Sequence, residues 1–190
     1  SHRVPASQLV ELALQTGELK PLERGASKRK GGLGSGSGRW HGRTDDRIVR
    51  PKLSVYQETL EIRTPGRGFS DVTRKVAEVV SRSGFETALC TLFVQHTSAS
   101  LVIQENADPN VLRDLGDWIG ELAPESRRWV HDDEGPDDMP AHARSAITKT
   151  SEIIPVTAGR LALGTWQAVY LWEHRARPHT RRLVIHVAGD

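Results

Sequence analysis

The chain has 190 residues, of which 37% are hydrophobic and 26% are charged, and its formal net charge is +2. No run of about 18 apolar residues occurs, so we expect no membrane-spanning helix. Cys90 is the only cysteine, which excludes an internal disulfide and a cysteine-cluster zinc site and fits a reducing compartment. We therefore expect a cytoplasmic protein with room for one ordinary domain plus additional sequence.

The first quarter of the chain differs in composition from the rest. Residues 1–52 hold 11 Lys/Arg against 5 Asp/Glu, a net +6, whereas residues 53–190 hold 15 against 19, a net −4. The stretch from 20 to 40 is rich in Gly, Ser and basic residues and offers little to bury. We predict that residues 1–51 form a basic extension, disordered or partly helical, and that residues 52–190 form the folded domain. The acidic body and the lack of interleaved aromatic residues disfavour nucleic-acid binding.

The first half of the predicted domain contains three strands and one helix. Residues 53–64, "LSVYQETLEIRT", have the composition and alternation of a strand. Residues 69–84 predict a helix that Ser70 or Asp71 caps and Gly84 ends, with one buried stripe of valines at 72, 76, 79 and 80. The apolar run at 86–96 predicts a central strand, and "SASLVIQEN" predicts the next one.

The second half begins with the strongest helix signal in the chain. In "DPNVLRDLGDWIGELAP", Asp108 is the expected cap and Pro109 the first helical residue. A short strand at 127–131 and a short helix at 140–148 follow, and four further strands are expected at 151–157, 160–164, 167–175 and 181–189. Two or three helices and about seven to eight strands, not in strict alternation, predict an α+β fold with a compact mixed or antiparallel sheet.

Polar residues at strand ends are the first candidates for a site. His96 ends an apolar strand and precedes a turn of small residues, so it either hydrogen-bonds the turn backbone or contributes to chemistry. Glu105 and Asn106 end the returning strand. If residues 92–96 pair with 101–105, all three side chains lie around one rim of the sheet.

The acidic stretch "VHDDEGPDDMPAH" at 130–142 is the second candidate. A bound cation, a set of proton-transfer groups or plain solvation would each explain its carboxylates, which raise one another's pKa unless a cation or hydrogen bonds intervene. Two histidines bracket it and two prolines stiffen it, which favours a metal or proton-transfer site. The spacing of His131 and His142 matches no standard zinc motif, so the identity of the metal stays open.

The stretch "GTWQAVYLWEHRAR" is the third candidate. In an alternating strand, Glu173 and His174 start on opposite faces, and Arg175 lies in the turn that follows. Taken alone, a histidine such as His174 is more often a structural hydrogen bonder than a ligand.

Several long motifs together resemble the YjbQ family, also called secondary thiamine-phosphate synthases. They are "HTSASLVIQENADP", "HDDEGPDDMPAH", "GRLALGTWQAVYLWEHR" and "RRLVIHVAG", in the family's order from Lys52 to Asp190. The resemblance implies a compact α+β domain that forms homotrimers, with a polar cavity near a subunit interface. It also implies a weak thiamine phosphate synthase activity, which joins a pyrimidine methyl diphosphate to a thiazole phosphate and releases pyrophosphate. The motif residues carried over are His96, Glu105, Asn106, Asp108, His131, Asp132, Asp133, Glu134, His142, Gln167, Glu173, His174 and Arg175.

The resemblance leads to a working hypothesis for a site that takes a phosphorylated small molecule. A divalent metal ion is assigned to His131, His142 and His174, and Arg175 to the departing diphosphate. Asp133 or Glu134 would stabilise the developing cation or move protons. The full set of expected catalytic residues is His96, Glu105, Asn106, Asp133, Glu134, Glu173 and Arg175. Two alternatives remain, another metal-assisted enzyme such as a hydrolase, and a non-catalytic trimeric small-molecule binder.

Overall fold

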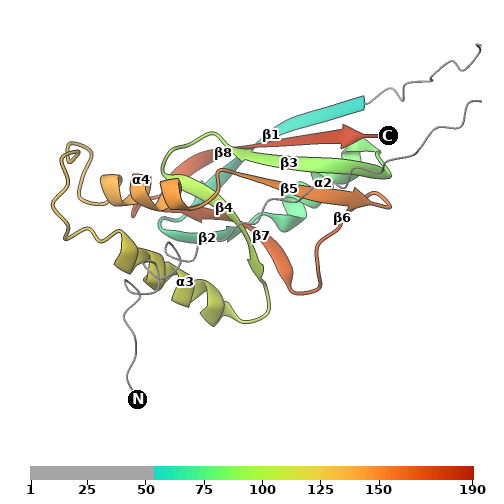
Figure 1. Cartoon of the computed structure of the whole chain (residues 1–190). Coiled ribbons are helices and arrows are strands. Elements are labelled where there is room, and N and C mark those ends of the chain that lie inside the picture. The colour runs from blue at the N-terminus through green and yellow to red at the C-terminus, as the bar shows by residue number, and fades with distance from the viewer. Residues whose placement is uncertain (1–53) are drawn as a thin grey trace, which may run out of the picture. The chain divides into compact units, whose positions relative to one another are not determined.

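Eight strands and three helices form residues 54–190, the part of the chain that the computed structural model describes. The predictions for residues 1–51, and the domain boundary placed after them, lie outside the described residues. The elements confirm the expected α+β class (Figure 1). In chain order they are β1 (Ser54–Thr64), β2 (Gly68–Asp71), α2 (Thr73–Ser83), β3 (Thr87–Val94), β4 (Ala99–Glu105), α3 (Pro109–Leu122), α4 (Asp138–Ile147), β5 (Ser151–Thr157), β6 (Arg160–Leu161), β7 (Gln167–Glu173) and β8 (His179–Gly189). Within this part of the chain, no helix is both long and apolar enough to cross a membrane.

The strands form two antiparallel sheets rather than one. The larger has the order β1-β8-β3-β5-β6 and the smaller the order β2-β7-β4. Strand β3 is central, as its apolar run predicted. It does not pair with β4, so the expected pairing of residues 92–96 with 101–105 is wrong. The turn after β3 carries the chain from one sheet to the other, where β4 pairs with β7.

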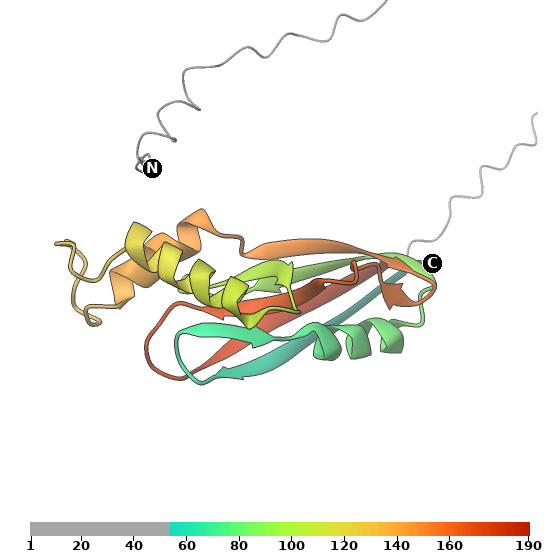
Figure 2. The same ribbon diagram turned by 90° about the horizontal axis from the view of Figure 1, so that it is seen from below.

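The core gathers buried side chains from both sheets and from α2, and Figure 2 shows this helix lying beside the strands. Helix α2 contributes the predicted valine stripe, of which Val76, Val79 and Val80 are almost inaccessible to solvent. Gly84 has φ 72°, the left-handed conformation in which glycine commonly ends a helix. Cys90 is buried in this core, and burial raises the pKa of its thiol to about 12, so it is not a nucleophile.

Strand β7 is buried on both faces. Val169 and Leu171 point into the core between the sheets, whereas Trp172 and His174 face α3 and line a pocket with it. Helix α3 begins as predicted, because the Asp108 carboxylate accepts the Asn110 N–H at 2.9 Å and Pro109 needs no partner. The strand expected at 127–131 is absent, and four of the five residues of this segment are exposed.

Candidate metal centre

The acidic loop ends where α4 begins, two residues earlier than predicted. The helix starts at Asp138, so Pro140 lies in the first turn, where a helix needs no N–H donor. Asp138 and His142 are therefore four residues apart on one helix and share a face. The D-x-x-x-H spacing is the sequence signal for Asp138, which the prediction missed because it placed the helix start at Pro140.

Asp138 gathers two histidines from the two ends of the loop. Its Oδ2 lies 2.9 Å from His131 Nε2 and 3.4 Å from His142 Nε2. One ligand atom from each of the three residues lies within 4.8 Å of the others, and no other such group occurs within residues 54–190. Zinc–nitrogen distances of about 2.0–2.1 Å place tetrahedral ligands about 3.3 Å apart. The three side chains fit a divalent cation with small adjustments.

Burial and hydrogen bonding fix the carboxylate while leaving the imidazoles accessible. The Asp138 side chain is 2% exposed, whereas those of His131 and His142 are 46% and 34% exposed. The second oxygen of Asp138 accepts a hydrogen bond from Arg175 Nη1. Such an outer partner orients a ligating carboxylate. Three protein ligands and an accessible side are the pattern of a catalytic metal site.

Arg175 holds the acidic loop. Besides Asp138, its guanidinium donates to the Asp137 carboxylate at 3.0 Å and to the Glu134 carbonyl at 2.9 Å. Burial by itself would raise the pKa of Asp137, but hydrogen bonds from Ala176 N–H and Arg175 outweigh it and hold this pKa below its usual value. One arginine therefore offsets part of the loop's negative charge, at Asp137 and Asp138, which differs from the leaving-group role predicted for Arg175. Asp132 and Asp133 remain exposed.

Glu173 and His174 lie on opposite faces of β7, in agreement with the predicted alternation. The Glu173 carboxylate is buried between the sheets and accepts from Arg181 Nε at 2.7 Å, Thr64 Oγ1 at 2.8 Å and Arg175 N–H at 3.0 Å. Burial raises its pKa, yet the hydrogen bond from Arg181 and the others hold it below the ordinary value. These contacts make Glu173 a structural anion.

His174 lies outside the cluster of His131, Asp138 and His142 and faces α3 instead. It is 1% exposed, and its Nε2 lies 2.9 Å from Ser100 Oγ. Burial, followed by the charge of Arg144, lowers the pKa of His174 to about 3, so this imidazole is neutral. Asp138, and not His174, converges with His131 and His142.

The residues expected around one rim are separated. Strand β4 places Ala99 opposite Glu173 and Glu105 opposite Gln167, so Glu105 and Asn106 lie at the far end, about 20 Å along the strand from its start. His96 Nε2 accepts the Arg182 N–H at 2.8 Å, so it bonds a backbone group as one alternative expected, but one of β8 rather than of the turn. Burial, then the charge of Arg181, lowers the pKa of His96.

His96 nevertheless borders a second polar pocket of about 610 Å³. Thr97, Ser98 and Arg181 line it on one side, and Glu134 and Arg175 of the loop region line it on another. Since Arg175 also touches Asp138, this pocket adjoins the cluster of His131, Asp138 and His142.

These features define an α+β protein with two antiparallel sheets and a histidine–carboxylate cluster beside a polar pocket. Comparison with known proteins gives the family. The profile of the UPF0047 protein YjbQ-like family matches residues 58–190, and the chain belongs to this family. A UPF0047 protein of Synechocystis sp. is 58% identical over 136 residues, covering 71% of this chain and 92% of its own length. The YjbQ protein of Escherichia coli O157:H7 is 38% identical and covers 71% of this chain and 99% of itself.

Solved structures agree with this assignment. A YbjQ-like protein of unknown function from Sulfolobus solfataricus superposes with a TM-score of 0.68 at 27% identity, over 73% of this chain and 99% of that one. A conserved hypothetical protein from Thermus thermophilus gives 0.60 at 40% identity, over 67% and 97%.

Proposed function

We propose that this protein is a divalent-metal-dependent enzyme that acts on a phosphorylated small molecule. The cluster of His131, Asp138 and His142 carries the proposal, because its ligand atoms converge within 4.8 Å around a buried, arginine-held carboxylate. A divalent ion bound there would supply positive charge and Lewis acidity to a phosphoryl oxygen. The adjoining pocket supplies the space for the substrate.

Within this class, the proposed reaction is transfer of the thiamine phosphate synthase type. The pyrimidine methyl diphosphate would lose pyrophosphate and bond to the thiazole nitrogen of the second substrate. Thr97 and Ser98 line the polar pocket and would offer hydroxyl groups to phosphate oxygens, and Glu134, which also lines it, would face the developing cation. The family resemblance supports this choice.

A second candidate is metal-assisted hydrolysis of a phosphate ester. All three nitrogens of the Arg175 guanidinium already donate to the acidic loop, and Arg181 is committed to Glu173. Neither arginine is therefore free to bind a departing pyrophosphate. Hydrolysis of a phosphate ester, in which water is the acceptor, depends less on such binding.

We also propose a homotrimer as the working form. The outer face of the larger sheet exposes an apolar surface that a monomer would leave in water, formed by Val55, Leu89, Phe93 and Ile153, of which Ile153 is 61% exposed. Contiguous exposed apolar surface marks interaction sites. Light scattering of the full chain, and of a Phe93→Lys variant, tests this assembly. A monomeric wild-type protein would contradict it.

Metal content tests the centre directly. The full chain, purified and incubated with Zn²⁺ or Mn²⁺ and dialysed, should retain about one ion, and Asp138→Asn or His142→Ala should lose at least tenfold in affinity. Asp133→Asn is the matched control, because this carboxylate lies in the same loop but outside the cluster. Equal retention by all variants would remove the centre.

Turnover separates the two candidate reactions. Thiamine phosphate formation from the two precursors, abolished by a chelator and by Asp138→Asn, supports the transferase. Release of phosphate or pyrophosphate that does not depend on the thiazole phosphate supports the hydrolase. Metal binding without either activity leaves the binder as the function and contradicts the proposed enzyme.

A further inference from the structure

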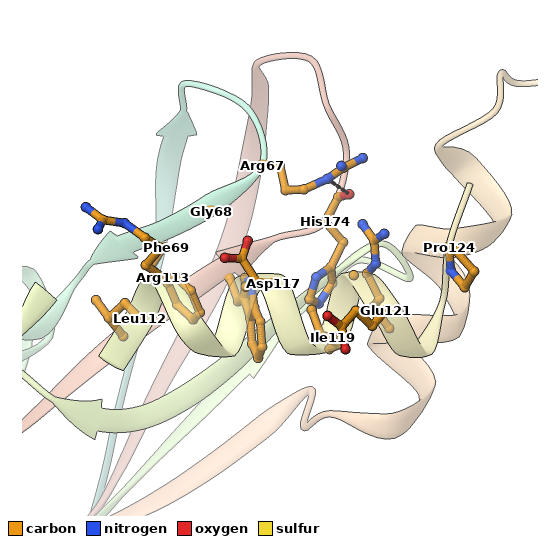
Figure 3. A pocket seen from close by; sticks show the side chains of 14 residues that line it. Arg67, Gly68, Phe69, Leu112, Arg113, Asp117, Ile119, Glu121, Pro124 and His174 are labelled. Carbon is orange, nitrogen blue, oxygen red and sulfur yellow. Dashed lines mark hydrogen bonds between the residues drawn. The ribbon is translucent and has the colours of Figure 1, made fainter. Parts of the chain in front are cut away.

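A larger pocket, separate from the metal-binding cluster, lies between α3 and the smaller sheet (Figure 3). Its volume is about 900 Å³, in the range of small-molecule sites. One wall is formed by Phe69 of β2 and Trp172 of β7, whose rings are stacked at 4.4 Å. The opposite wall is α3. The catalytic proposal above uses none of these residues.

The floor of this pocket contains polar atoms without partners. Arg144 is 3% exposed and donates through Nη2 to the Ala123 carbonyl at 2.9 Å. Within residues 54–190, its Nε and Nη1 have no hydrogen-bond partner, and neither has His174 Nδ1. Burying a guanidinium without a counter-ion costs several kcal/mol, and buried polar groups in folded proteins are normally bonded.

The charge of Arg144 and the tautomer of His174 decide which ligand group suits these nitrogen atoms. The Ser100 hydroxyl can donate to His174 Nε2, which leaves the proton on Nδ1 and makes it a second donor beside Arg144. The floor therefore presents one positive charge and one neutral N–H, while the other charged lining residues, Arg67 and Arg113 against Asp117 and Glu121, balance one another. A singly charged carboxylate satisfies this arrangement without excess charge, whereas a phosphate dianion does not.

The helix wall leaves room for a flat group. Gly116 and Gly120 are four residues apart, so both lie on the same face of α3, and both line the pocket. A Cβ placed on either glycine meets no atom within 4 Å. Each glycine in a helix costs about 1 kcal/mol of stability relative to alanine. A ligand that needs the open space beside the helix would explain why two glycines occur at this spacing.

We propose that this pocket binds a small organic carboxylate, with the carboxylate at Arg144 and His174 Nδ1 and a flat apolar body between the Phe69–Trp172 stack and the two glycines. The site is distinct from the proposed metal centre, so carboxylate binding can be tested independently of the proposed reaction.

Binding of matched probes to the full chain tests the proposal. Sodium 1-naphthoate should raise the melting temperature by several degrees at about a hundredfold excess over its Kd. Neutral 1-naphthamide and inorganic phosphate should not. If benzoate, 1-naphthoate and decanoate all leave the melting temperature unchanged, or if the amide binds as tightly as the acid, the proposal is wrong.

Variants locate the binding. Arg144→Met should weaken naphthoate binding about 10- to 100-fold, the worth of a hydrogen bond to a charged group. Arg113→Met is the control, because this arginine lies exposed at the same pocket and should change affinity less than about threefold. Gly120→Leu fills the wall, raises helix propensity and should abolish binding without loss of folding. Asp138→Asn should bind naphthoate normally even if it loses metal. Unchanged affinity in both Arg144→Met and Gly120→Leu would overturn the assignment.

Discussion

Two groups of buried polar side chains lie on opposite sides of the end of β7, and they differ in how well they are satisfied. On the inner side, the Glu173 carboxylate accepts from Arg181, Thr64 and Arg175 N–H. On the outer side, Arg144 and His174 keep three nitrogen atoms without a partner in the described residues. Both groups are almost completely buried.

This difference indicates that the inner group has a structural role and the outer group a binding role. A buried ion pair whose lone pairs are all bonded fixes the geometry of the sheets and leaves nothing for a ligand. A buried guanidinium and imidazole with free donors cost stability, and such a cost persists where a ligand offsets it. The neighbouring positions 173 and 174 thus have different roles because strand alternation directs them to different environments.

The largest expected effect tests the inner group. Glu173→Gln leaves Arg181 buried without its counter-ion and should lower the free energy of unfolding by about 3–5 kcal/mol. Urea denaturation of the wild type and the variant measures it. The double variant Glu173→Gln, Arg181→Met should recover much of the loss, since neither position of the pair then carries a buried charge. A single-variant loss below about 1 kcal/mol would contradict the structural role of this pair.

Local sequence patterns predicted most of the fold. The valine stripe of α2, the Asp108–Pro109 start of α3 and the central position of β3 depend on neighbouring residues, and all three are confirmed. The division into two sheets was not predictable in this way. Whether the turn after His96 returns β4 to the same sheet or carries it to another depends on distant strands, here β7 and β8.

The candidate site was predicted only in part, for the same reason. His131 and His142 were identified and do lie together, but Asp138 completes the group because α4 starts earlier than Pro140 suggested. The motif residues Glu105 and Asn106 lie at the distant end of β4. Arg144 belongs to none of the motifs. It is a candidate only because it is buried with unpartnered nitrogen atoms, which cannot be read from a sequence.

The next largest effect is the pH dependence that His174 confers. Its folded pKa is about 3 against an ordinary 6.5, so the unfolded chain binds the extra proton between these values. Stability therefore falls as pH falls through this window, by at most about 1.4 kcal/mol per unit. The Glu173 contribution is lost only as pH drops below the ordinary glutamate value of 4.5, so the range from 6.5 to 4.5 excludes it.

Denaturation at several pH values between these limits measures the slope. His174→Gln should show a slope smaller than the wild type, while a residual slope remains because burial also lowers the pKa of His96. Identical slopes in the two proteins would show that His174 is accessible to protons in the folded state, and the contrast between the two faces of β7 would be lost.

A smaller effect is expected from Arg144, although it is as buried as Arg181. Arg144→Met removes one hydrogen bond to the Ala123 carbonyl and at the same time removes an uncompensated charge. Because removal of the charge offsets the lost hydrogen bond, we expect the free energy of unfolding to fall by no more than about 1 kcal/mol without ligand. Chemical denaturation beside Glu173→Gln gives the comparison directly. A loss of the same size as that variant's would mean that Arg144 has a structural counter-ion.

The smallest effect is expected where the charge is solvated. The Glu134 carboxylate is 68% exposed and lies 3.8 Å from Arg175 Nη1, whereas its backbone carbonyl makes the closer contact with this arginine. Glu134→Gln keeps the carbonyl and should change the free energy of unfolding by less than about 0.5 kcal/mol, less still at high salt. Asp138→Asn, which alters a buried carboxylate bound by the same arginine, is the matched comparison. A large loss of unfolding free energy in Glu134→Gln would show that burial does not decide how much these ion pairs stabilise the fold. The exposed carboxylate would then contribute as much as the buried carboxylates that bind Arg175.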